Sequence, residues 1–240
     1  MPALPALQGP ANKSERKQNR DKFLQIEGVK SKIDAMAKKF GVSPNEILQV
    51  MEKETGGSFS AAQQHFGGGG ARGLIQFLGD AKDGGGTESF KTIKGKKHEI
   101  SDIAKMGELE QLDLVETFFE EGLENAGQDK FQPGELSLAI AAPAFIGKDD
   151  KWIANWAEKN PKTYARMMKN NPGWVGDDGK MDKSSITSFY TGNLPNESEF
   201  ANVKENNIEN VDNPNVQEAG MFGSVNLRGM VDKGKSLIDK

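Results

Sequence analysis

The chain contains 240 residues, enough for one domain of ordinary size with extensions or for two small domains. Its formal net charge of −4 argues against a nucleic acid partner, and the absence of cysteine excludes disulfides, thiolate metal sites and a cysteine nucleophile. No apolar run approaches the roughly 18 residues of a membrane-spanning helix, and residues 1–7 lack the basic and apolar regions of a signal peptide.

Two predicted helices follow a polar start. Residues 1–20 are rich in Pro and Ala and then in polar side chains, which predicts a flexible leader. From Asp21, apolar residues recur at spacings of three and four, which indicates an amphipathic helix that ends at Gly41. Ser43-Pro44-Asn45-Glu46 then supplies an N-cap, a first-turn proline and a capping box for a second helix, which ends at Gly56.

The rest of the chain alternates glycine-rich stretches with helical patterns. Residues 58–72 and 79–98 are predicted loops on either side of the short apolar segment Gly73–Phe77. Further helices complete a mainly α domain at 21–192, with one core and a small irregular or β-containing lobe. Residues 193–240 are rich in Asn, Glu and Pro with scattered apolar residues, which predicts a polar linker and a docking tail.

Glu54 stands at the end of the second predicted helix, on the same face as Ile47 and Met51. A carboxyl there is poorly hydrated and close to the negative end of the helix dipole, and both effects favour its protonated form. A protonated carboxyl near neutral pH is what a general acid for glycosidic cleavage requires. Glu52 faces away from this stripe. The alternative interpretation is that Glu54 is an ordinary surface residue at a helix end.

A motif pair carries a family resemblance. Glu54-Thr55-Gly56, followed about twenty residues later by Gly73-Leu74-Ile75-Gln76, resembles the Glu-Ser-Gly and Gly-Leu-Met-Gln motifs of the soluble lytic transglycosylase and goose-type lysozyme superfamily. The resemblance implies an α+β lysozyme-like fold with a substrate cleft. It also implies that Glu54 is the catalytic acid, that Gln76 contacts saccharide, and that Thr55 and Phe77 belong to the same binding set.

Downstream segments also resemble phage-encoded lysozyme-like proteins; they are residues 110–113, 118–119, 142–148 and 171–174. Trp174 follows Asn-Pro-Gly, so we expect an exposed ring that stacks on a sugar. Trp152 and Trp156 stand at helical spacing and are expected in the core.

One family motif is missing. Many members carry Ala-Tyr-Asn-Ala-Gly, whose Tyr sits near the catalytic Glu, whereas residues 141–145 here read Ala-Ala-Pro-Ala-Phe. Tyr190 and Tyr164 are the candidates to supply the missing hydroxyl. A second carboxylate would come from Asp80, Asp83 or Glu88, none of which lies in a motif. The resemblance instead implies a one-carboxylate route that ends in a 1,6-anhydro sugar.

The function expected from these patterns is a lytic transglycosylase that cleaves the β-1,4 bond between N-acetylmuramic acid and N-acetylglucosamine in peptidoglycan. No cofactor or metal is expected, because His65 and His98 lack metal-ligand spacing. The resemblance implies a virion protein of the phage tail or baseplate that acts in the host periplasm or cell wall, with its two tails binding phage structural proteins. Two alternatives stay open: a weakly active or inactive structural protein with a wall-binding domain, and a hydrolytic lysozyme.

Overall fold

The computed structural model describes residues 4–7, 9–67, 70–82, 86–87 and 90–192 of the chain. The described part is mainly α, as the sequence predicts, and it carries small antiparallel hairpins. The predicted tail at 193–240 lies outside the described residues. The helices are α1 (Lys13–Gln25), α2 (Val29–Phe40), α3 (Pro44–Glu54), α4 (Ile100–Ile103), α5 (Glu108–Ala126), α6 (Glu135–Ala141), α7 (Asp150–Lys159), α8 (Pro161–Asn170) and α9 (Lys183–Thr191).

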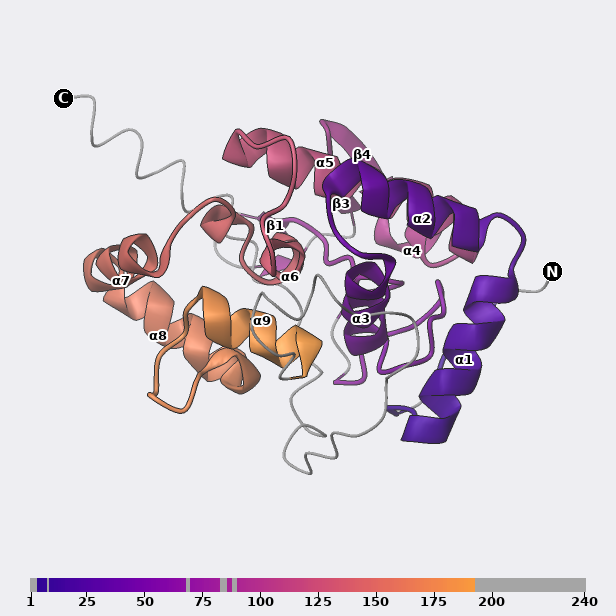
Figure 1. Ribbon diagram of the computed structural model, residues 1–240, viewed down its shortest axis with the longest axis horizontal. Helices are drawn as coiled ribbons and strands as arrows, with labels where there is room; N and C mark the ends of the chain where they lie inside the picture. The colour runs from indigo at the N-terminus through magenta and orange to yellow at the C-terminus, as the bar shows by residue number, and fades with distance from the viewer. Residues whose placement is uncertain (1–3, 8, 68–69, 83–85, 88–89, 193–240) are drawn as a thin grey trace.

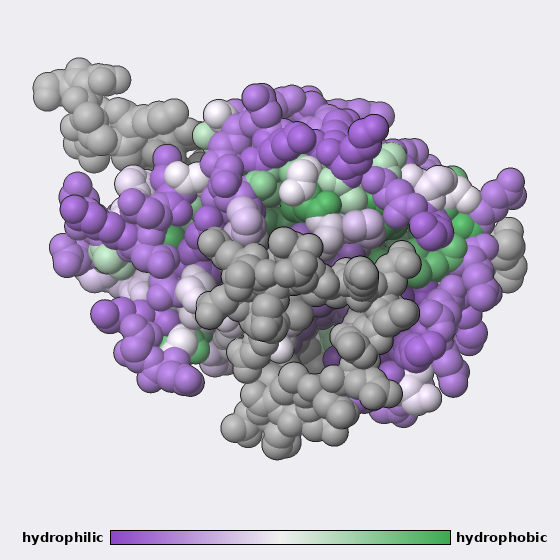
Figure 2. All heavy atoms as spheres, viewed as in Figure 1, coloured by the Kyte–Doolittle hydropathy of each residue, from purple (hydrophilic) through white to green (hydrophobic). Residues whose placement is uncertain are grey.

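Helix α3 lies near the middle of the described fold, with α1 and α2 on one side of it and α6 and α9 on the other (Figure 1). Ser43 caps its start, since the Ser43 hydroxyl accepts from the Glu46 N–H and the Glu46 carboxylate accepts from the Ser43 N–H. Apolar residues on its inner face pack into one continuous core with residues of α2, α5 and α6. On the face shown in Figure 2, hydrophilic residues cover most of the described helix surfaces.

Short strands occupy part of the stretch predicted as a loop at 79–98. Strands β1 (Ala81–Lys82) and β2 (Gly86–Thr87) pair with each other, and β3 (Phe90–Ile93) pairs with β4 (Lys96–Glu99). Lys94 and Gly95 connect β3 to β4 with φ angles of 47° and 76°, the left-handed conformation that two-residue hairpins favour. Gly95 therefore marks the turn of the β3–β4 hairpin, and the loop prediction for 79–98 is wrong in part.

The N-terminal residues are ordered, so the predicted flexible leader at 1–20 is wrong for the residues described there. Helix α1 begins at Lys13 rather than near Asp21, behind a capping box formed by Asn12 and Glu15. Capping of this kind contributes about 1 kcal/mol and needs no apolar residue. Composition therefore underestimated the order of this stretch.

Residues 4–7 and 9–12, which we call the N-terminal segment, lie along the loop that follows α3. The Leu7 N–H donates to Gln63 Oε1 at 2.9 Å, and Gln63 Nε2 donates back to the Leu7 carbonyl at 3.0 Å. The Ala11 N–H donates to the Gly56 carbonyl at 2.8 Å. Backbone groups of a sequence with few large apolar residues thus find long-range partners that no local pattern indicates.

No helix among the described residues has the length and apolar character needed to cross a membrane.

Candidate active site

Glu54 meets Tyr190 where α3 ends against α9. The Tyr190 hydroxyl donates to Glu54 Oε1 at 2.7 Å, across 136 positions of sequence. Asp182 caps α9 and Gly192 ends it, which places Tyr190 in its last turn. Tyr164, the other tyrosine considered, exchanges hydrogen bonds of 2.7 and 2.9 Å with the backbone of Met181 instead.

The environment of Glu54 favours its protonated form. Burial raises the pKa of the Glu54 carboxyl from 4.5 to about 7, although the Tyr190 hydrogen bond and the nearby Lys53 ammonium both act to lower it. The direction agrees with its position on the apolar side of α3. Burial, together with the Glu54 charge, raises the pKa of Tyr190 well above its usual value, so Tyr190 remains a hydrogen-bond donor around neutral pH.

This raised pKa predicts a pH-dependent stability difference between the wild type and Glu54→Gln. A carboxyl with a raised folded-state pKa stabilises the fold fully below its unfolded pKa, and this contribution disappears as the pH rises through the folded value. The window therefore runs from pH 4.5 to about 7. At pH 8 the variant should be more stable by up to about 3 kcal/mol, and near pH 4 the two should match. Urea unfolding at both pH values measures this; equal stability at pH 8 would contradict the raised pKa.

The segment Gly73–Phe77 turns back on itself beside α5. The N–H groups of Arg72 and Phe77 each donate to the other residue's carbonyl, at 3.0 and 2.7 Å. Gln76 adopts a φ of 51°, and its amide Nε2 donates inward to the carbonyls of Gly73 and Gln63 at 3.0 and 3.3 Å. The ring of Phe77 packs edge-on against Phe118 of α5. The motif thus forms a tight, internally bonded turn.

Gln111 of α5 anchors this turn. Its Oε1 accepts from the Leu74 N–H at 2.6 Å, and its Nε2 donates to the carbonyls of Ala61 and Ile103 at 3.0 and 2.8 Å. Gly73 is required here, because a Cβ would lie 2.3 Å from Gln111 Oε1 and its φ is +87°. The family resemblance included residue 111 but gave it no role.

The four residues predicted to contact saccharide are all buried. Thr55, Gln76, Phe77 and Trp174 are exposed by 0, 3, 3 and 2%, so their side chains lie in the interior, and of the four only Gln76 and Phe77 border a small hollow found among the described residues. Thr55 ends α3 instead, because its hydroxyl donates to the Met51 carbonyl at 2.7 Å and accepts from the Phe59 N–H at 3.1 Å. The exposed ring expected at Trp174 is wrong, since a turn after α8 packs it into the core.

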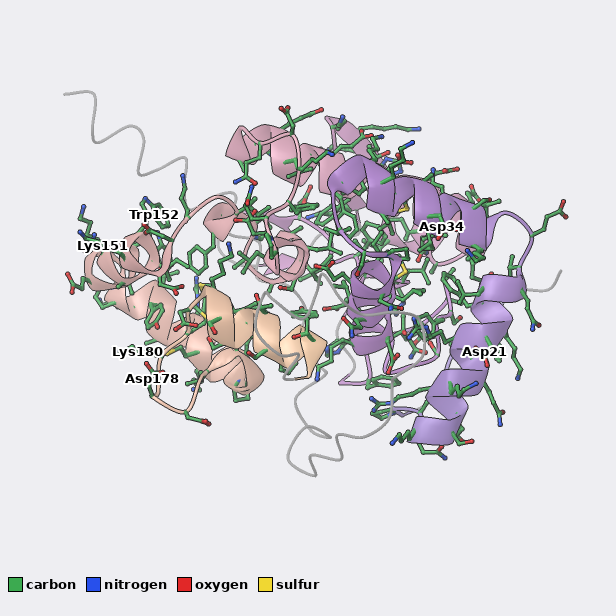
Figure 3. All side chains as sticks on the ribbon, in the orientation of Figure 1. Asp21, Asp34, Lys151, Trp152, Asp178 and Lys180 are labelled. Atoms are coloured by element: carbon green, nitrogen blue, oxygen red, sulfur yellow. The ribbon has the colours of Figure 1, made fainter. Side chains whose placement is uncertain are left out.

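Of the other two tryptophans, Trp152 differs from expectation and Trp156 packs against the core. Trp152 is 37% exposed on α7, toward the edge of the molecule in Figure 3, so its predicted core position is wrong. Trp156 is half-buried and packs edge-on against Phe145. Helical spacing placed both rings on one face but did not indicate how far the neighbouring elements cover that face.

Other parts of the protein pack closely against Gly56 and Gly57. A Cβ on Gly56 would lie 2.4 Å from the ring of Phe66, and one on Gly57 would lie 2.4 Å from the side chain of Arg16. Both glycines have positive φ angles, 58° and 84°. Phe66, Arg16 and the N-terminal segment therefore fill the space beside these two glycines, and no room for a substrate chain is left there.

Asp80 is the only candidate second carboxylate whose side chain the structure describes. Its carboxylate accepts from the Thr92 N–H at 2.8 Å and pairs with Lys91 at 3.3 Å. Burial acts to raise the Asp80 pKa, but these partners outweigh it and the pKa is lowered. The side chains of Asp83 and Glu88 lie outside the described residues. Within the described chain, no group of three or more metal-binding side chains is placed to hold a metal ion.

Comparison of the chain with protein-family models, curated proteins and solved structures finds no match.

Proposed function

We propose that this protein is a peptidoglycan lytic transglycosylase in which Glu54 serves as both general acid and general base. The observation that supports this most directly is the Glu54 carboxyl itself. It accepts a hydrogen bond from the Tyr190 hydroxyl, and burial raises its pKa to about 7. A carboxyl with a pKa near the working pH can give up a proton and take one back without a large free-energy penalty in either direction.

The proposed reaction balances with one carboxyl. Protonated Glu54 donates its proton to the glycosidic oxygen, and the bond from the muramic acid C1 breaks as the substrate's acetamido oxygen attacks C1. Glu54, now a carboxylate, takes the proton from the C6 hydroxyl, whose oxygen displaces the acetamido oxygen from C1. The products are a 1,6-anhydromuramic end and a free 4-hydroxyl. Tyr190 holds Oε1 throughout, which leaves Oε2 to carry the proton.

The place of action is proposed on the resemblance to phage-encoded lysozyme-like proteins. There the enzyme would be a virion component of the tail or baseplate and would open the wall from the periplasmic side. Phage structural proteins would bind the parts of the chain that flank the catalytic fold.

A structural wall-binding role is the second candidate, and one observation favours it. Glu54 borders neither of two small hollows found among the described residues, which weighs against turnover at its carboxyl. One hollow is bordered by Tyr190 and Gln49, the other by Gln76, Lys91 and Phe118. A protein of this kind would bind sacculi without releasing soluble fragments.

Product masses test the proposed reaction against hydrolysis. Incubation of the purified protein with sacculi should release muropeptides that are one water lighter than lysozyme products, because O6 of the sugar replaces water as the nucleophile. Mass spectrometry of the soluble fraction measures this, with a hydrolytic lysozyme digest of the same sacculi as the reference. Fragments carrying the added water would assign a hydrolytic lysozyme, and binding without any fragments would assign the structural role.

A further inference from the structure

Two consecutive residue pairs face each other where α3 ends against α9. Lys53 places its Nζ atom 3.9 Å from the centre of the Phe189 ring, and the next residue, Glu54, accepts the hydrogen bond from Tyr190. The rings of Phe189 and Tyr190 meet nearly edge to face, with centroids 5.3 Å apart. These four side chains form one connected cluster, which we call the α3–α9 clamp.

Lys53 differs from the lysines of this fold that form ion pairs with carboxylates. Lys32, Lys39 and Lys94 each bridge two acidic side chains near α5. Within the described part of the chain, the contact found for the Lys53 ammonium is the aromatic face of Phe189, not an ion pair or a hydrogen bond. A half-buried cation on an aromatic face is held by the ring quadrupole, and the contact strengthens as water is excluded.

We propose that Lys53 is a positioning residue: its ammonium, seated on Phe189, fixes the last turn of α3 against α9 and so holds the Glu54 carboxyl on the Tyr190 hydroxyl. The inference rests on the proposed role of Glu54 as the acid. Thr55 caps the end of α3 within the chain, and Lys53 adds a contact from its last turn to another helix, where turns fray unless side chains hold them.

The charges around the clamp determine in which direction the Glu54 pKa should move when the clamp is removed. Glu54 faces the Tyr190 hydroxyl from α9 and the Lys53 ammonium from its own helix, and both favour the carboxylate. Burial lowers the pKa of Lys53 to about 8; Arg16 of α1 acts in the same direction, and Glu54 and Glu52 oppose it. Among the described residues, none from α2 or α6 is among the groups that shift the pKa of Glu54 or Lys53. Removing the Lys53 charge or its aromatic seat should therefore raise the Glu54 pKa further.

Carboxyl NMR titration of the full-length protein tests the proposal without requiring turnover. The Glu54 signal is assigned by its loss in Glu54→Gln and is then followed in Lys53→Met, Lys53→Arg and Phe189→Leu. We expect Lys53→Met and Phe189→Leu to move the midpoint upward by about half a unit or more. Lys53→Arg keeps a cation for the ring and should stay near wild type. On sacculi, the alkaline limb of the pH–rate profile should move in the same direction.

The chain supplies a matched control in its β3–β4 hairpin. Lys97 Nζ lies 4.0 Å from the centre of the Phe90 ring, nearly the same distance as in the Lys53–Phe189 contact, in a hairpin away from α3 and α9. Lys97→Met and Phe90→Leu should leave the Glu54 midpoint unchanged. If folded Lys53→Met leaves the Glu54 midpoint unmoved, the proposal is overturned. If Lys53→Met does not fold, Phe189→Leu provides the same test. An equal shift of the midpoint in Lys97→Met also overturns the proposal. If the midpoints shift but sacculi stay intact, the clamp stands and the proposed function fails.

Discussion

Glu54→Gln is expected to reduce the release of soluble muropeptides from sacculi by at least about 10²-fold, the range that a positioned general acid contributes. Glutamine keeps the size of the side chain and still accepts from the Tyr190 hydroxyl, so the fold and the α3–α9 contact should persist. What it lacks is the transferable proton, for both the protonation of the glycosidic oxygen and the later activation of the C6 hydroxyl. Initial rates of solubilisation, with a circular dichroism melt for each protein, measure this.

Glu52→Gln provides the control two residues earlier. Glu52 is half-buried on another face of α3, and its Oε1 atom lies 3.8 Å from Arg16 Nη1 of α1. The substitution therefore removes one negative charge close to the charge that Glu54→Gln removes. The rate at which Glu52→Gln releases soluble muropeptides should stay close to that of the wild type. Full activity of Glu54→Gln, or an equal loss in both variants, would contradict the assignment of Glu54 as the acid.

Gln111→Leu is expected to destabilise the fold by about 4 kcal/mol. The substitution leaves three buried backbone groups without their partner: the N–H of Leu74 and the carbonyls of Ala61 and Ile103. Each unsatisfied buried group costs about 1–3 kcal/mol, and leucine adds nothing that could hydrogen-bond to them. For a chain of this size the melting temperature should fall by about 10 °C, which calorimetry measures.

The matched control is Glu110→Leu, the preceding residue of α5. Glu110 is exposed, so the same leucine there should change the melting temperature by only a degree or two. A melting temperature of Gln111→Leu that equals that of Glu110→Leu would show that Gln111 does not anchor the turn at Gly73–Phe77.

Local chemistry made several features readable from the sequence. Ser43, Pro44 and Glu46 act within a single turn, so their capping pattern predicted the start of α3 correctly. The spacing of Ile47, Met51 and Glu54 likewise depends only on helical geometry, and it indicated the environment that raises the Glu54 pKa. In each of these cases the interacting groups are close in sequence.

Features that depend on distant partners were mispredicted or left open. Trp174 looked like an exposed ligand contact, but it is buried in the core that the whole fold builds. The N-terminal segment looked flexible because its hydrogen-bond partner Gln63 lies more than fifty residues away. No residue pattern encodes which loop will lie against which, because that choice depends on the packing of the whole core.

Glu54 therefore combines both kinds of information. The sequence alone determined that a carboxyl would stand on the apolar face at the end of a well-capped helix, since helix periodicity and capping are local. Only the tertiary structure decided between Tyr190 and Tyr164, placed Lys53 on Phe189 and filled the space beside Gly56. The Glu54–Tyr190 and Lys53–Phe189 contacts each join residues separated by 136 positions, and they form only when α9 packs against α3.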